Sequence, residues 1–194
     1  MSVTVTTPPT IEPIHAIGLD QVKTHLRVDH DDENELLKSA CAAAFDFVES
    51  LAWRQLLAAT LTLRLDRFDA LPCGTILLPR SPARAVDSIE YLDADGVSQT
   101  LAATEYDVDL NSEPARIRPV DRWPATYCKP NAVTIQFQAG YDSHDDIPAL
   151  LLHAVKLVIA DFYEHRTPGE STRVAVCELV KLHSVHDHRL AEFV

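Results

Sequence analysis

Glycine is scarce in this chain of 194 residues, which contains only five. Each lies between stretches that we expect to form helices or strands, and no two of them make a G-x-G motif. Loops that cradle a phosphate need closely spaced glycines, because the backbone must approach the ligand. The sequence therefore excludes a nucleotide-binding loop of that kind.

Long apolar runs are missing, and none approaches the roughly 20 residues that span a bilayer. The first fifteen residues have neither the basic start nor the apolar core of a signal peptide. The four cysteines, at positions 41, 73, 128 and 177, include no C-x-x-C pair. We therefore expect no membrane partner, synthesis in the cytoplasm, and cysteines that stay reduced.

Cations are outnumbered, with 17 Lys and Arg against 29 Asp and Glu and a formal net charge of −12. A protein that grips duplex DNA needs clustered cations to displace the counterions of the phosphates. No such cluster is present, so we expect no tight binding to nucleic acid. An acidic surface can still face DNA without holding it.

Catalytic motifs are absent, including the G-x-S-x-G elbow and the H-E-x-x-H zinc motif. One candidate metal site is the stretch "HSVHDHR", in which His183 and His186 stand three residues apart and His188 or Cys177 could be a third ligand. Alternatively, this stretch is a solvated or interface-lying tail whose attachment depends on pH through its histidines. We expect no metal and no cofactor, and keep a small metal-dependent hydrolase using these histidines as an alternative.

The stretch "IEYLDADGVSQTL", residues 89–101, has the aspartates and glycine of a calcium-binding loop. If Gly96 took the sixth position of such a loop, the first and twelfth ligands would be Tyr91 and Ala102, and neither suits calcium. Asp-Gly between two alternating strands favours a hairpin turn instead, because both residues tolerate positive φ. We predict a hairpin and no calcium site.

Hydrophobic periodicity predicts an α+β fold. A short helix is expected from Leu19 to about Arg27, and a long helix follows Asp32, which fits a capping box with Glu35. Short alternating strands between residues 57 and 140 predict an antiparallel sheet built from hairpins. A long helix then opens at "DDIPALLL", and a short one is expected around residues 174–182. The sequence thus predicts a helical body with an antiparallel β-hairpin insertion: two N-terminal helices, a long helix after the sheet, and a C-terminal helix and tail.

Each long helix is expected to bury one face. For the first, the buried residues are predicted to be Leu36, Leu37, Ala40, Cys41, Ala44, Phe47, Val48 and Leu51. For the second, they are predicted to be Ile147, Leu151, Val155, Val158 and Phe162. Three prolines and four threonines predict an extended arm over residues 1–17. Residues 18–170 are then one domain with the β insertion at about 57–140, and residues 171–194 form a C-terminal helix and tail.

Two groups of charged residues stand out. A run of acids precedes the first long helix: Asp29, Asp31, Asp32, Glu33 and Glu35. A solvated cluster at a helix N-terminus explains it, and paired carboxylates or a magnesium site are the alternative. A group of arginines lies on or near the β insertion: Arg80, Arg84, Arg116, Arg118 and Arg122. They are either surface charges paired with nearby acids or contacts to the acidic face of another copy.

Four stretches, within residues 18–166, carry a resemblance through their order and spacing. They are "LDQVKTHLRVDHDDENELL", "LPRSPARAVDSIEYLDADGVSQTL", "EYDVD" and "AGYDSHDDIPALLLHAVKLVIADFYEHR". In these stretches the chain resembles the head–tail connector (adaptor) proteins of long-tailed bacteriophages and prophages. It departs from them at "SLAWRQLL" after the first long helix and at the C-terminal "CELVKLHSVHDHRLAEFV".

The resemblance implies a structural protein of the virion neck without enzyme activity, made in the host bacterial cytoplasm. Its copies are expected to form a ring of about twelve beneath the portal protein. Such a ring extends the channel through which DNA passes during packaging and ejection, without tight binding, and docks the stopper or tail-completion protein. A cytosolic binding module that forms no ring is a further alternative.

Three roles follow for the charged and terminal residues. The five acids named above are expected to face the channel, and the five arginines to lie at the interface between subunits. The last 24 residues hold three acids, three Lys or Arg and three His, so they are far less acidic than the chain as a whole. We expect them to dock on the portal or another partner through Leu179, Leu182, His183, His186, His188, Leu190 and Phe193.

Overall fold

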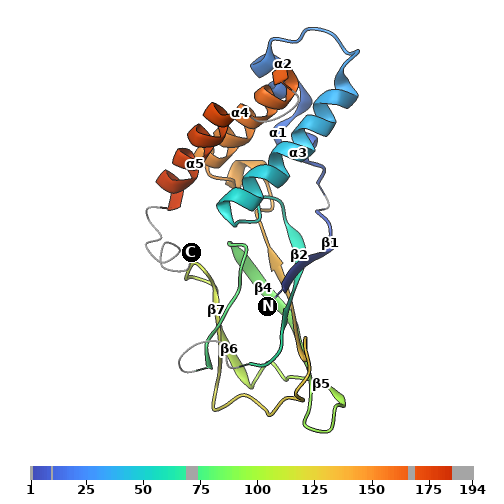
Figure 1. Cartoon of the computed structure of the whole chain (residues 1–194), viewed down its shortest axis with the longest axis vertical. Helices are drawn as coiled ribbons and strands as arrows, with labels where there is room; N and C mark the ends of the chain where they lie inside the picture. Colours follow the sequence, from blue (N-terminus) through green and yellow to red (C-terminus); the bar gives the residue numbers. More distant parts are fainter. Residues whose placement is uncertain (1, 10, 69–73, 166–168, 185–194) are drawn as a thin grey trace. The chain divides into compact units, whose positions relative to one another are not determined.

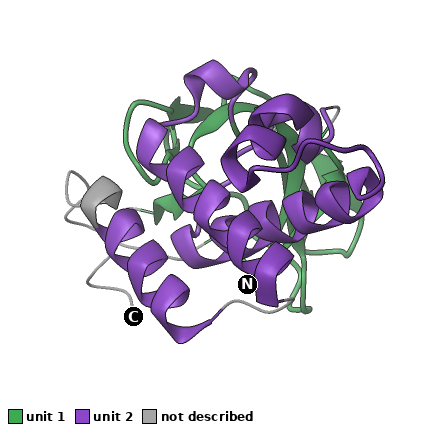
Figure 2. Ribbon diagram, turned by 90° about the horizontal axis from the view of Figure 1, so that it is seen from above, with its two compact units in different colours: residues 1–10, 58–140 green, residues 11–57, 141–194 purple. Residues whose placement is uncertain are grey.

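The structure is a computed structural model that describes residues 2–9, 11–68, 74–165 and 169–184. The chain divides into two compact units (Figure 2). The sheet unit comprises residues 1–10 and 58–140, and the helical unit comprises residues 11–57 and 141–194. The sequence predicts a β insertion at about residues 57–140, and residues 58–140 belong to the sheet unit. The combination of helices and antiparallel sheets confirms the α+β class.

The helical unit contains five α-helices in its described residues (Figure 1): α1 (Pro13–Ile17), α2 (Leu19–Leu26), α3 (Asn34–Ala52), α4 (Ala149–His165) and α5 (Glu170–Ser184). A short 3-10 helix, His144–Asp146, precedes α4. Helix α3 packs against α4 and α1, and α5 packs against α4 and α3. All five helices contribute side chains to one core, so the segments before and after the sheet unit fold together.

Helix α3 buries one continuous face: Leu37, Ala40, Cys41, Ala44, Phe45, Val48 and Ala52. This face follows the spacing of three and four residues expected of an amphipathic helix. The prediction was wrong for Leu36 and Leu51, which are 49% and 39% exposed. Leu36 lies about 100° from Leu37 around the helix, outside the buried face. Leu51 has the angular position of the buried face, but it lies in the last turn of α3. Burial also raises the pKa of the Cys41 thiol to about 12, which leaves it unreactive.

The start of α3 differs from the predicted capping box. Helix α3 begins at Asn34, and its cap residue Glu33 makes no side-chain cap hydrogen bond. Asp32 lies one residue too early to cap this helix. The Asp31 carboxylate instead accepts a hydrogen bond from Asn34 Nδ2 at 3.2 Å, and Asp31 O accepts one from Asn34 N.

The end of α3 is held by a carboxylate. Glu49 Oε1 accepts hydrogen bonds from Leu56 N at 2.8 Å and from Gln55 Nε2 at 3.0 Å. Trp53 ends the helix in the left-handed conformation, with φ of 52°, and its side chain is 53% exposed. The helix therefore ends at Trp53, and Glu49 accepts a hydrogen bond from the backbone N–H of Leu56, three residues further on.

The sheet unit contains eight strands in its described residues: β1 (Ser2–Thr7), β2 (Ala59–Leu65), β3 (Ile76–Leu77), β4 (Ala83–Leu92), β5 (Ser98–Thr100), β6 (Tyr106–Asp109), β7 (Arg116–Pro119) and β8 (Val133–Ala139). They form a five-stranded sheet in the order β1-β2-β8-β4-β5 and a three-stranded sheet in the order β3-β7-β6. Every named pair is antiparallel, as predicted. One hydrophobic core includes side chains of both sheets, among them Leu63, Ile135 and Ile117.

The two faces of the five-stranded sheet differ in chemistry because successive side chains of a strand alternate between them. Leu61 lies opposite Phe137, and Leu63 lies opposite Ile135, all of them in the core. On the other face, Thr62 lies opposite both Thr4 and Gln136. Hydroxyl and amide groups rather than charges thus cover much of the polar face.

The stretch that resembled a calcium loop is the β4–β5 hairpin, as predicted. Asp93 Oδ1 accepts hydrogen bonds from Asp95 N and Val97 N, both at 3.0 Å, and Gly96 takes a φ of 81°. A hydrogen bond from the Gln99 side chain and those backbone N–H groups lower the pKa of Asp93. The Asp93 carboxylate therefore stabilises the turn through these hydrogen bonds.

The first seventeen residues differ from the predicted extended arm. Ser2–Thr7 form β1 at the margin of the five-stranded sheet, and Pro13–Ile17 form α1 (Figure 1). Alternating Val3 and Val5 suit a strand, since β-branched residues favour extended backbone. Pro13 suits the first turn of α1, because a proline there loses no hydrogen bond. Ile14 and Ile17 then enter the helical core.

The conformation of Trp53 yields a stability prediction. The variants Trp53→Gly and Trp53→Ala both remove the indole ring, but only glycine adopts positive φ without a Cβ clash. We expect Trp53→Gly to be more stable than Trp53→Ala by about 1 kcal/mol in urea unfolding. Equal midpoints for the two variants would show that the turn relaxes out of the left-handed conformation.

Candidate functional site

The acidic segment, residues 29–35, lies between α2 and the first turn of α3. Lysine side chains and a tyrosine hydroxyl hold it to the rest of the helical unit. Lys23 Nζ donates to Asp31 Oδ1 at 2.5 Å, and Lys38 Nζ donates to Glu35 Oε1 at 2.6 Å. The bond from Lys23 and then that from Asn34 lower the pKa of Asp31. Asp29 and Asp32 are exposed. The segment therefore presents negative charge to solvent, while Asp31 and Glu35 are balanced locally.

Glu33 connects this segment to α4. The Tyr163 hydroxyl donates to Glu33 Oε2 at 2.5 Å, and the bond to this carboxylate raises the pKa of the phenol. Tyr163 also packs against the helical core. No local sequence pattern predicts this contact, because the two residues are 130 positions apart. It fixes the loop before α3 against the last turns of α4.

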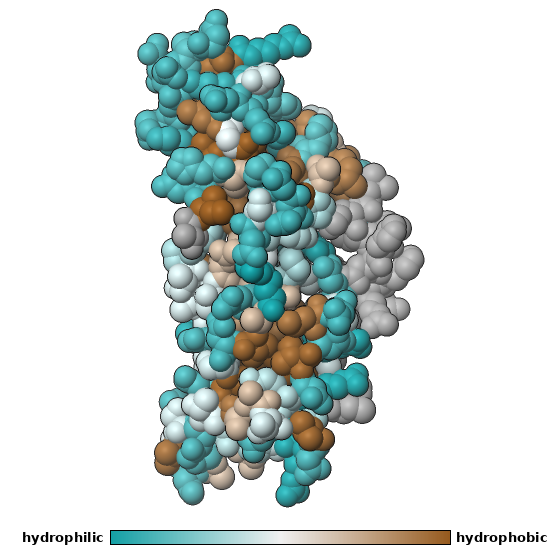
Figure 3. Space-filling model, turned by 180° about the vertical axis from the view of Figure 1, so that it is seen from behind, coloured by the Kyte–Doolittle hydropathy of each residue, from teal (hydrophilic) through white to brown (hydrophobic). Residues whose placement is uncertain are grey.

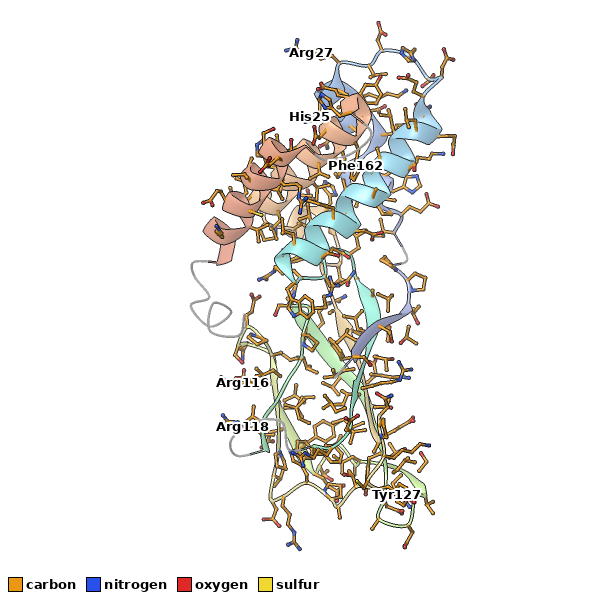
Figure 4. All side chains as sticks on the ribbon, viewed as in Figure 1. His25, Arg27, Arg116, Arg118, Tyr127 and Phe162 are labelled. Atoms are coloured by element: carbon orange, nitrogen blue, oxygen red, sulfur yellow. The ribbon has the colours of Figure 1, made fainter. Side chains whose placement is uncertain are left out.

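The five arginines do not form a single row on one element. Arg116 and Arg118 occur on one face of β7, where Figure 4 labels them along the same strand. Arg80 and Arg84 flank the start of β4, and Arg122 lies in the loop after β7 beside Glu105 and Trp123. Whether these arginines meet another subunit stays a prediction.

Arg116 and Arg118 make hydrogen bonds to side chains of the sheet unit. Arg116 Nη2 donates to Asp109 Oδ2 at 2.8 Å and Arg116 Nε donates to Ser112 Oγ at 2.9 Å. Arg118 Nε donates to Thr75 Oγ1 at 3.1 Å. The hydrogen bonds from Ser112 and from Arg116 lower the pKa of Asp109. For Arg116, pairing with a nearby acid, one of the two interpretations of the sequence, is thus realised.

Helix α5 is longer than predicted, and part of it packs in the helical core. Val176 and Val180 are buried, and Leu179 is half-buried against the same core. Leu182 and His183 lie within α5, but their side chains are outside the described residues. His186, His188, Leu190 and Phe193 also lie outside them. The docking role of this segment remains a prediction.

The described residues contain no group of three His, Cys, Asp or Glu side chains placed to hold a metal ion. The histidine site proposed as an alternative depends on His186 and His188, which fall outside those residues. Within the same ranges, no helix has the length and apolar character to cross a membrane.

Exposed apolar side chains occur on both units (Figure 3). Hydrophobic surface gathers among hydrophilic side chains in the part of that view that belongs to the sheet unit. The large exposed apolar residues of the sheet unit are Val5, Val97, Val108, Leu110, Val120 and Tyr127. Single exposed residues of this kind are normal on a soluble protein, so position within the fold must decide which of them matter.

Comparison with known families gives a match over part of the chain. Residues 16–93 match the family described as phage gp6-like head-tail connector protein. The matched region runs from the end of α1 through β4, and includes the acidic segment and Trp53. No curated protein sequence matches the chain.

Solved structures share the fold over nearly the whole chain. A chain in the neck of an empty gene transfer agent (GTA) particle, computed with C6 symmetry, has a TM-score of 0.74 at 24% identity, with 93% of this chain and 95% of that chain covered. A chain in the virion of a native GTA particle has a TM-score of 0.73 at 25% identity, covering 92% and 94%. A chain in the neck of the native GTA particle, computed with C12 symmetry, has a TM-score of 0.70 at 24% identity, covering 93% and 94%.

The sequence match and the shared fold together confirm the resemblance to the phage head–tail connector family. Because the covered share exceeds nine-tenths of both chains, the common fold includes strands of the sheet unit as well as the helices. The resemblance that the sequence shows over residues 18–166 thus extends to the three-dimensional structure.

The Asp109–Arg116 pair leads to a pH-dependent prediction. The pKa of Asp109 is lowered in the folded chain from its ordinary value of 3.8. Its contribution to stability is therefore complete above that value and is lost as the pH falls through the folded pKa. We expect Asp109→Asn to lower the midpoint of thermal unfolding at pH 7, and to unfold like the wild type once the pH is low enough to protonate Asp109.

Asp107→Asn is the matched control, because Asp107 is an exposed acid on the same strand. We expect it to change the midpoint little at either pH. A difference between wild type and Asp109→Asn that persists unchanged at acid pH would contradict an ionic origin.

Proposed function

We propose that this protein is a structural head–tail connector of a tailed phage, prophage or related particle. In the proposal, its copies form a ring of about twelve under the portal, extend the DNA channel and dock the stopper or tail-completion protein. The observation that carries the proposal is the shared fold over 92% of this chain with a chain of the GTA virion, together with the head–tail connector match over residues 16–93.

The charge of the chain supports a channel role. Each copy carries a net charge of −12, and a ring concentrates that charge around its axis. Asp29 and Asp32 are exposed beside α3, where they can face passing DNA without binding its phosphates. We propose that the segment from Asp29 to Glu35 lines the channel, and that the arginine group meets the acidic surface of the neighbouring copy.

Docking on the portal is assigned to the C-terminal tail, with Leu179, Leu182, His183, His186, His188, Leu190 and Phe193 as its contacts. Helix α5 supports this role, because it is anchored in the helical core through Val176 and Val180. A C-terminal tail that continues from an anchored helix can bind a partner while the helical unit stays folded. In this proposal the protein has no catalytic activity, and it belongs to the virion neck.

The decisive experiment combines the purified chain with the portal protein of the same genome and images the product by electron microscopy. A ring of new density stacked coaxially on the portal is expected, and its symmetry gives the copy number. A bare portal, when both proteins are folded, would favour the binding module or the metal-dependent hydrolase. Stoichiometric zinc that is lost on substituting His183, His186 and His188 would favour the hydrolase.

The docking role predicts the effect of a truncation. Removing residues 184–194 is expected to abolish attachment to the portal and to leave the unfolding midpoint of the remaining chain nearly unchanged. The measurement is co-sedimentation with the portal, with thermal unfolding of the truncated chain as its control. Attachment at wild-type level would assign portal docking to another surface.

The channel role predicts the effect of reversing charge. In particles that carry Asp29→Lys with Asp32→Lys, DNA is expected to leave the capsid more slowly, because lysines on the wall bind phosphates. The slowing should decrease as salt is raised. Asp107→Lys with Asp121→Lys changes the net charge equally at two exposed acids of the sheet unit and is the control. Equal slowing by both pairs would place the acidic segment outside the channel wall.

A further inference from the structure

The outer edge of β1 has little protection against pairing with another strand. A free edge exposes unpaired backbone N–H and C=O groups, and proteins guard such edges with charges, prolines, bulges or short strands. Four edges end the two sheets in the described part of the chain: β1 and β5 in one, β3 and β6 in the other. They differ in how they are guarded.

Three of these edges are guarded in recognised ways. β3 has two residues and β5 has three, which leaves little backbone to pair with. β6 has four residues and carries Asp107 and Asp109. β1 has six residues with the sequence "SVTVTT", and residues 1–11 contain no Asp, Glu, Lys or Arg. Its pairing with β2 is regular from Ser2 to Val5 and shifts between Val5 and Thr7.

The apolar face of the sheet is incomplete at this edge. Val3 lies opposite Leu63 and packs against the core of the sheet unit. Val5 lies opposite Leu61, on the same face, yet is 54% exposed. A strand added to the outside of β1 would cover Val5 while pairing the free backbone groups from Ser2 to Val5. The backbone and the side chains at this edge therefore favour the same kind of partner.

A second copy of this chain fits the edge. Copies with a net charge of −12 repel one another, and a surface without acids adds no further repulsion to a contact between them. The exposed stretch from Ser2 to Thr7 meets that condition. A cyclic ring also requires each copy to offer its neighbours two different surfaces, one of which can be an open sheet edge. The fold neighbours come from necks computed with C6 and C12 symmetry.

We infer that the outer edge of β1, from Ser2 to Val5, is an assembly surface at which an extended segment of a neighbouring copy adds to the five-stranded sheet. This inference rests on the proposed function in one respect, namely that copies assemble side by side. It differs from the arginine contacts proposed above, because the interaction is made by backbone groups and by Val5.

Val5→Lys tests the inference. The substitution places a charge on the core-facing side of the edge strand, where an added strand would have to bury it. In the free chain the side chain stays in solvent, since Val5 is already half-exposed. The new cation also reduces the net charge from −12 to −11, so general repulsion between copies becomes weaker rather than stronger. A loss of assembly therefore cannot come from repulsion.

Val97→Lys is the matched control, because Val97 is 55% exposed in the same unit and receives the same change of charge. Self-association is measured by sedimentation velocity of the full chain, alone and with the portal protein. We expect Val5→Lys to raise the dissociation constant between copies by about tenfold or more, and Val97→Lys to leave it within about twofold. In the wild type, the amides of residues 2–5 should exchange hydrogen more slowly after assembly.

The outcomes separate this inference from the proposed function. Val5→Lys chains that still bind the portal, but as separate copies, would support both. Wild-type rings that Val5→Lys leaves intact, or that both lysine variants weaken equally, would overturn the β1 edge and leave the connector function standing. A wild type that remains monomeric with and without the portal would overturn the inference, and failure to bind the portal at all would overturn the proposed function.

Discussion

The helical unit depends on the carboxylate of Glu49, which holds the chain where it turns after α3. Its Oε1 atom accepts hydrogen bonds from the Gln55 side chain and from the backbone N–H groups of Leu56 and Leu57. Hydrogen bonds to a charged group contribute about 1.5–3 kcal/mol each, more than neutral ones. Leu56 O then accepts a hydrogen bond from Tyr141 N, which begins the segment that returns from the sheet. The Glu49 carboxylate thus positions Leu56 and Leu57, which lead into β2. Leu56 in turn positions Tyr141, which follows β8.

This arrangement explains how an insertion of more than eighty residues can interrupt a helical core without splitting it. Within the helical unit the outgoing and returning segments pair at Leu57 and Tyr141. Within the sheet unit the same two segments continue as β2 and β8, with Ala59 opposite Ala139. The insertion therefore starts and ends at neighbouring backbone positions, so no long linker is needed. Its core is complete in itself, and it draws on both sheets.

Local patterns in the sequence were sufficient for most of the elements. The Asp-Gly turn before Val97 and the buried stripe of α3 follow from residues a few positions apart. The first strand was missed because its partner, β2, lies near position 62, and prolines at positions 8 and 9 resemble a linker. The contact between Glu33 and Tyr163 depends on tertiary packing, which no local pattern encodes. For function, the order of several stretches indicated the family, while single residues did not identify a partner surface.

An open edge and a high negative charge have opposite effects on self-association. Each copy carries −12, so free copies repel one another, but this repulsion is screened beyond about 8 Å at physiological ionic strength. It slows their encounter more than it weakens a contact once formed, because β1 brings no acid to the contact. Copies that a common support holds side by side no longer depend on free encounter. An uncharged edge on an acidic subunit therefore favours assembly on a template and limits uncontrolled strand pairing in solution.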